Sequence, residues 1–175
     1  QVGEGGFEVG LFIADFQTCF DMGAASPGDK LDNFLFDECI IGENQANKIV
    51  QLDYEAPSAW AAFWIRLNGA DITNYDTLTF YARGDADVGI PLDFKLELKG
   101  ANNTQTNVFY VSGLNEEWRY YEISLESFKT PTGFSPICSW EDMSELVFTF
   151  ESGVSGEKGR IYLDNIYLQR RQNGA

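Results

Sequence analysis

The sequence contains no histidine, little sulphur and little positive charge. Its 175 residues include three Cys, two Met, and twelve Lys or Arg against twenty-seven Asp or Glu, which gives a net charge of −15. Without an imidazole there is no Ser-His-Asp or Cys-His nucleophile pair, and no zinc site that uses histidine. The surplus of carboxylates opposes binding to nucleic acid or to an anionic membrane surface. The partner that remains is a neutral molecule, a cation or a protein.

Long apolar runs are also missing. No stretch of about 18 apolar residues is present, so the sequence predicts no transmembrane span. The hydrophobic content of 44% is nevertheless ample for a core, and the length suits one domain over 1–175, with an ordered core at about 7–169. Cys19 and Cys39 are one candidate disulfide, with Cys138 as a free buried thiol. Three buried thiols are the alternative, because three cysteines are too few for a disulfide scaffold.

Apolar and polar residues alternate with a period of two in many short segments. In 92–99, for example, four apolar residues alternate with Asp93, Lys95, Glu97 and Lys99. Strict alternation predicts half-buried strands, and we expect about ten of them, at 7–16, 33–38, 48–54, 59–67, 77–83, 92–99, 107–112, 118–125, 146–151 and 159–168. Short helical turns are expected at 126–129 and 140–145. Strands separated by polar turns, such as Asn68-Gly69, indicate an all-β antiparallel sandwich of the jelly-roll type.

The outward faces of four predicted strands carry aromatic and charged side chains. If these strands share one sheet, they form a surface that suits a sugar chain, because aromatic rings stack on pyranoses and charged groups bind the hydroxyls. The candidate ligand-binding residues are Trp60, Trp64, Arg66, Tyr81, Arg83, Asp93, Glu97 and Tyr120. The alternative is that these aromatics are structural and covered by loops. Trp118 is the first residue of a predicted strand, which favours a structural role for it. The pattern of 107–112 does not show which face of that strand is buried, so the role of Tyr110 stays open.

The many carboxylates suggest two further functions. A glycoside hydrolase needs a pair of them about 5–10 Å apart. So acidic a chain always contains some such pair, so the composition is almost no evidence for hydrolysis. Calcium prefers carboxylate, amide and backbone oxygens. Asp15 and Gln17 near the first strand and Asp164 in the last are candidates, because terminal strands often pair. No contiguous EF-hand loop is present, so such a site would join separate segments.

Several segments occur in an order that resembles a known family. They are Asp15-Phe16-Gln17, the stretch from Gly42 to Leu52, Trp60 to Trp64, Ile72 to Gly84, Phe94 to Leu98, Trp118 to Phe128, and Gly159 to Ile166 with its Leu163-Asp-Asn-Ile ending. The ordered set resembles the galactose-binding-like jelly rolls. In particular it is similar to carbohydrate-binding modules of the family 11 type and their relatives in families 4, 16, 22 and 30.

The resemblance implies a non-catalytic module that binds β-glucan in a cleft on one sheet and is joined to a glycoside hydrolase. It also implies a structural calcium ion. The matching ligand positions are Gln17, the backbone oxygen of Lys48, and Asp164, with Asp15 as a further candidate. Relatives often have Glu where Gln17 stands, and the neutral amide lowers the charge of the ligand set.

We therefore expect a secreted or cell-surface bacterial module, monomeric and not an enzyme. Its expected ligand is an uncharged polysaccharide, with a β-1,4- or mixed-linkage β-glucan favoured. A protein-interaction domain on the same fold is the alternative, since the resemblance extends loosely to an assembly-factor domain of respiratory complex I. A glycoside hydrolase or lyase is the third reading.

Overall fold

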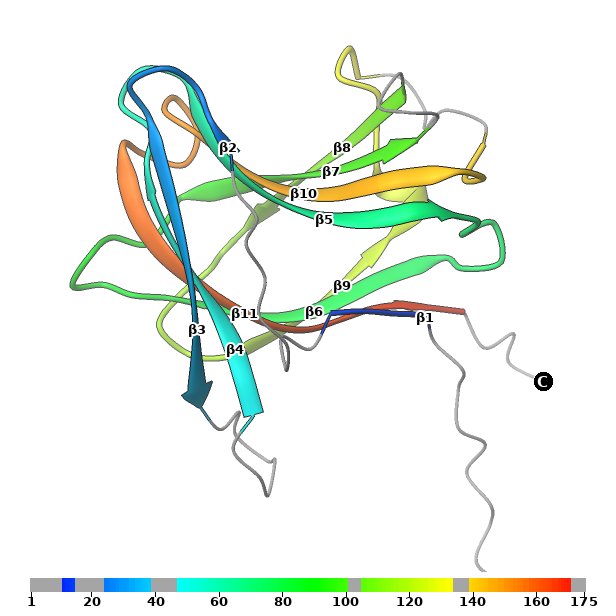
Figure 1. Ribbon diagram of the computed structural model, residues 1–175, viewed down its shortest axis with the longest axis horizontal. Coiled ribbons are helices and arrows are strands. Elements are labelled where there is room, and N and C mark those ends of the chain that lie inside the picture. The colour runs from blue at the N-terminus through cyan, green and yellow to red at the C-terminus, as the bar shows by residue number, and fades with distance from the viewer. Residues whose placement is uncertain (1–10, 15–23, 39–46, 101–104, 134–138, 171–175) are drawn as a thin grey trace, which may run out of the picture.

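The computed structural model shows two antiparallel β-sheets packed face to face (Figure 1). The described residues are 11–14, 24–38, 47–100, 105–133 and 139–170. The first sheet contains, in spatial order, β3 (Lys30–Glu38), β4 (Asn47–Glu55), β11 (Lys158–Gln169), β6 (Thr77–Gly84) and β9 (Arg119–Ser124), with β1 (Leu11–Ala14) beside β11. The second contains β2 (Ala24–Ala25), β5 (Trp60–Ala70), β10 (Met143–Glu151), β7 (Asp93–Gly100) and β8 (Gln105–Ser112). The predicted all-β sandwich is confirmed.

Ten strands of the described residues correspond to the ten predicted ones, with bounds shifted by a few residues, and the short β2 (Ala24–Ala25) is an eleventh that the alternation does not predict. In β7, Phe94, Leu96 and Leu98 are fully buried while the residues between them are partly exposed. The predicted strand at 7–16 is described only over Leu11–Ala14. The three cysteines lie outside the described residues, so neither prediction about them is decided.

Two local predictions are wrong, and left-handed backbone explains both. Asn68 (φ 54°) and Gly69 (φ 77°) form a bulge inside β5 instead of the expected turn, because β10 continues to pair with the strand as far as Ala70. The expected helical turn at 140–145 is replaced by Asp142 (φ 55°), which leads directly into β10. The turn expected at 126–129 is a 3-10 helix at Leu125–Ser127. Within the described residues, no helix is long and apolar enough to span a bilayer.

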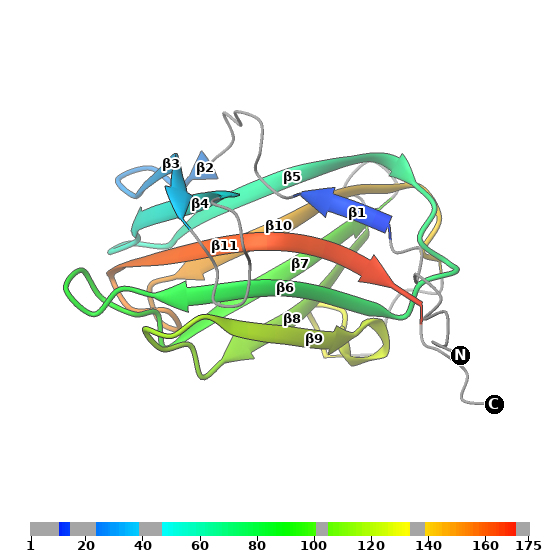
Figure 2. The same ribbon diagram turned by 90° about the horizontal axis from the view of Figure 1, so that it is seen from below.

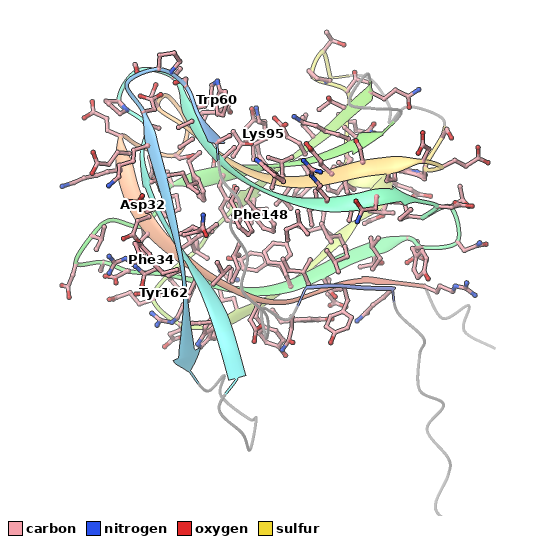
Figure 3. The ribbon with its side chains drawn as sticks, viewed as in Figure 1. Asp32, Phe34, Trp60, Lys95, Phe148 and Tyr162 are labelled. Atoms are coloured by element: carbon pink, nitrogen blue, oxygen red, sulfur yellow. The ribbon has the colours of Figure 1, made fainter. Side chains whose placement is uncertain are left out.

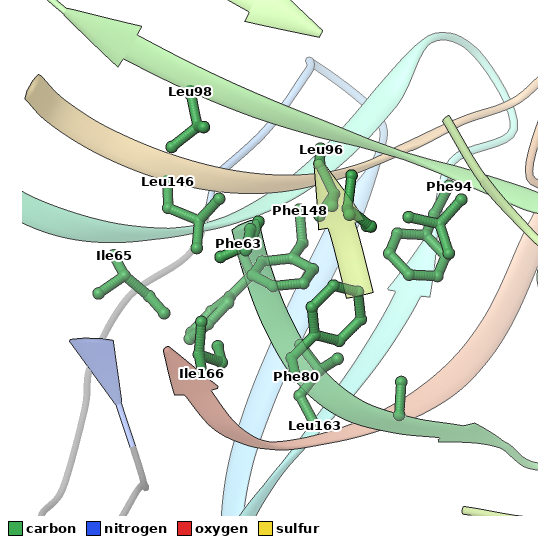
Figure 4. Packing of buried hydrophobic residues seen from close by; sticks show 14 of the residues in the cluster. Phe63, Ile65, Phe80, Phe94, Leu96, Leu98, Leu146, Phe148, Leu163 and Ile166 are labelled. Carbon is green, nitrogen blue, oxygen red and sulfur yellow. The ribbon is translucent and has the colours of Figure 1, made fainter. Parts of the chain in front are cut away.

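The core lies between the two sheets and is rich in phenylalanine (Figure 4). Phe148 of β10 is central to it, since its ring meets Phe80 of the first sheet edge-on at 5.7 Å and Phe94 of β7 at 6.2 Å. Tyr54 of β4 stacks on Phe150 with the ring centroids 4.3 Å apart. Such aromatic pairs add about 0.5–1.5 kcal/mol each beyond their buried area. Because both inner faces are filled in this way, a binding surface has to lie on an outer face, at a sheet edge or on the loops.

Candidate functional site

A groove of about 370 Å³ lies on the outer face of the second sheet, over β5, β10 and β7. The middle of β5 and of β10 bows toward the first sheet, so this face is concave (Figure 1). Trp60 and Lys95 project from this face, whereas Phe148 lies between the sheets (Figure 3). The groove is lined by Ala24, Trp60, Ala62, Trp64, Lys95, Glu97, Lys99, Glu145, Val147, Thr149 and Glu151.

Two tryptophans form the apolar side of the groove. Trp60 and Trp64 share the outer face of β5 because side chains two and four residues apart on a strand point the same way. Ala62 lies between them, and Ala24 of β2 is its register partner. These small residues leave the space between the two rings open. Trp60 is 39% exposed, so its ring is accessible to a ligand.

A chain of charged hydrogen bonds forms the polar side. The ammonium of Lys95 lies 2.7 Å from Oε1 of Glu151 and 2.9 Å from Oε1 of Glu97. Lys99 lies 3.3 Å from Oε2 of Glu97, and the hydroxyl of Tyr110 donates to Oε2 of Glu151 at 3.0 Å. Burial lowers the pKa of Lys95, but the hydrogen bonds to Glu151 and Glu97 outweigh it and leave that pKa above its ordinary value. The polar groups of the groove are thus held in fixed directions before any ligand binds.

Thr149 of β10 adds one polar atom between these two sides. Its register partners are Ala62 of β5 and Lys95 of β7, and it is only 5% exposed. Among the described residues, its Oγ1 has no hydrogen-bond partner. A buried hydroxyl usually has a partner, since leaving one unpaired costs about 1–3 kcal/mol. Because this oxygen is itself buried beneath the groove, a ligand hydroxyl would pair with it only after the side chains around it move.

The structure brings together part of the predicted ligand set. Trp60, Trp64 and Glu97 line the groove. Arg66 belongs to the same outer face of β5, and its guanidinium lies 5.3 Å from the ring centroid of Trp64, a cation–π distance. Asp93 begins β7 on that face as well, but it does not line the groove.

Tyr81, Arg83 and Tyr120 lie on the other sheet, so the prediction of one aromatic surface across a single sheet is wrong. Tyr81 and Arg83 are in β6 and Tyr120 is in β9, and both strands belong to the first sheet. The alternation tells which residues point outward from a strand, but both sheets of a sandwich have an outer face. Arg83 also has a structural role, since its guanidinium lies 3.8 Å from the ring centroid of Tyr162 and 5.4 Å from that of Trp118.

Sequence reasoning missed several groove residues that the tertiary structure reveals. The alternation predicts outward faces for Lys95 and Thr149, but the predicted ligand set does not include them. Tyr110, whose face the alternation does not decide, does not line the groove and contacts it through Glu151. Lys99, Glu145 and Glu151 complete the polar lining. The alternation of β7 and β10 already placed these side chains outward. The missing information was that β10 pairs with both β5 and β7 and so joins the three outer faces.

The predicted calcium ligands are only partly described. Asp15 and Gln17 lie outside the described residues. Asp164 of β11 is fully buried. Asp164 follows Leu163, which pairs with Val50 of β4. Lys48 precedes Val50 by two residues at the start of the same strand, so its backbone lies near Asp164. Among the described residues, no three Cys, Asp or Glu side chains gather as a group that could hold a metal ion.

Comparison with solved structures shows which class of protein shares this fold. No protein-family model matches the sequence, and no curated protein matches it. A family 11 carbohydrate-binding module from Clostridium thermocellum, solved with a β-1,3-1,4-mixed-linked tetrasaccharide, superposes with a TM-score of 0.72 at 14% identity, covering 92% of this chain and 95% of that one. The family 11 module of a cellulosomal cellulase of the same organism gives 0.70 at 15% identity, over 93% and 95%.

An enzyme structure contains the fold as well. An exo-β-agarase matches with a TM-score of 0.66 at 12% identity, over 96% of this chain and 26% of the agarase. The chain therefore has the β-sandwich fold of family 11 carbohydrate-binding modules, and the expected resemblance is confirmed at the level of fold.

Proposed function

We propose that this protein is a non-catalytic module that binds an uncharged polysaccharide in the groove of the second sheet. A β-1,4- or mixed-linkage β-glucan is the favoured ligand. The observation that carries the proposal is the pairing of Trp60 and Trp64 on one side of the groove with the polar network of Lys95, Glu97 and Glu151 on the other. Aromatic rings suit the apolar faces of sugar rings, and the fixed polar groups suit their hydroxyls.

The charges of the groove favour a neutral chain over an anionic one. Two lysines, Lys95 and Lys99, are both engaged by glutamates, and Glu145 adds a third carboxylate to the lining. An anionic sugar would meet this surplus of carboxylates inside a strongly acidic protein. A sugar hydroxyl both donates and accepts hydrogen bonds, so it satisfies ammonium and carboxylate groups equally well.

The biological role that we propose is to hold an associated glycoside hydrolase, outside the cell, close to its polysaccharide substrate. The sharing of one lysine by Glu97 and Glu151 suits positioning more than proton transfer. The family 11 modules of the same fold support this role, since one was solved with a tetrasaccharide and another belongs to a cellulase.

Affinity electrophoresis in gels that contain mixed-linkage β-glucan tests the function. We expect the wild-type protein to be retarded and Trp64→Ala to migrate faster in the glucan gel, because the ring supplies stacking of about 1 kcal/mol or more. Phe34→Ala is the matched control, since Phe34 is an exposed aromatic (49%) on β3 of the other sheet. If Trp64→Ala leaves the retardation unchanged, the groove is not the glucan-binding site. No retardation in any neutral polysaccharide would favour a protein-interaction domain, and release of reducing sugar would show a hydrolase.

We also propose a structural calcium ion that joins the two terminal parts of the domain. Its ligands would be Asp164, the backbone oxygen of Lys48, and Asp15 and Gln17, the last two lying outside the described residues. The support for this assignment is the position of Asp164, which is fully buried in β11 next to the residue that pairs with Val50 of β4, two residues from Lys48. Carboxylate and backbone oxygens are ligands that calcium prefers. The ion would stabilise the sandwich and take no direct part in sugar binding.

A further inference from the structure

A second depression lies on the opposite side of the molecule, on the outer face of the first sheet. Figure 2 views this face, with β11, β6 and β9 side by side. The depression has a volume of about 340 Å³, at the lower end of the range for small-ligand pockets, about 300–1,000 Å³. It is lined by Thr79, Tyr81, Tyr120, Asn165, Tyr167 and Gln169.

A pair of tyrosines forms the aromatic part of this depression. Tyr81 of β6 and Tyr120 of β9 are register partners, so their side chains leave the sheet next to each other. Their ring centroids are 5.0 Å apart at an angle of 45°, and Tyr120 is 44% exposed. The amide of Gln169 donates to the hydroxyl of Tyr120 at 3.3 Å, which restrains the more exposed ring. The result is an accessible aromatic surface edged by hydrogen-bonding groups.

A β-bulge in β11 shapes the adjoining part of the depression. Between Asp164, which pairs with Tyr81, and Tyr167, which pairs with Thr79, β11 has one residue more than β6. Asn165 takes up this extra residue in a left-handed conformation, with φ of 49°. Bulges re-aim side chains away from the regular alternation. The extra residue shifts the alternation of β11, so that Ile166 points into the core while Asn165 and Tyr167, on either side of it, line the depression.

The residues of this depression carry hydroxyl, amide and aromatic groups but no charge. Arg83, the next outward residue of β6 after Tyr81, is held against the rings of Tyr162 and Trp118. Glu122, the register partner of Thr79, does not line the depression. This lining contrasts with the groove of the second sheet, where five charged side chains take part.

From these observations we propose that the depression is a second sugar-binding site, which takes one or two units of a neutral oligosaccharide. Its chemistry matches that ligand: an aromatic pair for the apolar face of a pyranose, and neutral donors and acceptors for the hydroxyls. The site is independent of the groove, because the two lie on opposite sheets. A module with both sites binds two chains, or two stretches of one matrix, and gains avidity from the second contact.

NMR titration of the ¹⁵N-labelled protein tests this proposal. The probes are cellotetraose, a mixed-linkage β-glucan tetrasaccharide, galactose- and mannose-based tetrasaccharides, and a galacturonate tetramer as the anionic comparison. The double variant Trp60→Ala/Trp64→Ala removes the aromatic side of the groove. We expect at least one neutral probe to shift the amides of Thr79, Tyr81 and Asn165, in the wild type and in the double variant alike, with the anionic probe weaker.

Three variants identify the source of the shifts. Tyr120→Ala should weaken this second binding event about tenfold, from the lost stacking and hydrogen bond. Tyr120→Phe keeps the ring and should weaken it less, and Phe34→Ala, on β3 at the far edge of the same sheet, should leave it unchanged. Dispersed spectra confirm that each variant is folded. The proposal is overturned if no neutral probe shifts these amides, or if Tyr120→Ala binds like the wild type. The amides of β5 and β10 report on the groove separately, so either site can fail while the other stands.

Discussion

Lys95 and Glu151, 56 residues apart in the sequence, meet across β7 and β10 with Nζ 2.7 Å from Oε1. The same ammonium contacts Glu97, and the second oxygen of Glu151 accepts a hydrogen bond from Tyr110. One lysine therefore holds two carboxylates and, through one of them, a tyrosine in place along the groove. This arrangement makes Lys95 a position at which a substitution tests stability and the proposed ligand binding together.

Replacing Lys95 with Met should affect both properties. The variant keeps the length of the side chain but removes the cation that lies between Glu97 and Glu151, so that Glu151 loses its lysine and Glu97 keeps only its contact with Lys99. This should lower the free energy of unfolding by about 1–2 kcal/mol in this partly exposed site. Binding of mixed-linkage β-glucan should weaken severalfold because the carboxylates lose their fixed directions. Calorimetric titration and urea unfolding measure the two effects. Lys30→Met, which breaks the exposed pair of Lys30 with Asp32 on the other sheet, is the control and should change neither.

The pH dependence of stability should contain a contribution from the same lysine. The pKa of Lys95 in the folded protein is above its ordinary value of 10.5, so the folded state binds this proton more tightly than the unfolded state. The resulting stabilisation is complete below pH 10.5 and is lost as the pH rises through the folded-state pKa. Between pH 9 and pH 12 the free energy of unfolding should therefore decrease less steeply with rising pH for Lys95→Met than for the wild type. Parallel curves would show that the lysine does not contribute.

Thr149 should separate binding from stability. Replacement by Val keeps the shape and removes a buried hydroxyl that has no partner among the described residues. We expect unfolding free energy to stay equal or to rise by up to about 1 kcal/mol, while affinity for the glucan falls about fivefold. The measurements are thermal unfolding with and without glucan, and calorimetric titration. A loss of stability in the free protein would mean that the hydroxyl has a structural partner and is not reserved for a ligand.

Removal of calcium should lower thermal stability without abolishing sugar binding. We expect EDTA to reduce the Tm of the wild type, and Asp164→Asn to reduce it and to remove the response to EDTA. Asp87→Asn changes an exposed carboxylate of the turn between β6 and β7 and should keep the full response. Differential scanning calorimetry, with calcium content checked by atomic emission, measures both. An EDTA effect of equal size in Asp164→Asn would show that Asp164 is not a ligand of the ion.

The amino-acid sequence by itself determined the strands and the direction of most of their side chains. The reason is that alternation is local: in 92–99 the burial of three apolar residues forces Asp93, Lys95 and Glu97 to the other face. The same reasoning placed Trp60 and Trp64 outward on β5. The absence of histidine and the surplus of acid are also properties of composition alone, and they limit the candidate chemistry whatever the fold.

Only the tertiary structure decided which outward faces come together. Strand pairing depends on backbone hydrogen bonds between distant segments, and these bonds carry little information about side-chain identity. Pairing of β10 with both β5 and β7 assembles the groove, whereas pairing of β6 with β9 sends Tyr81 and Tyr120 to the opposite side. The bulges at Asn68 and Asn165 were likewise set by the register of neighbouring strands. The predicted single surface is thus two surfaces, because outward direction is a local property and sheet membership is not.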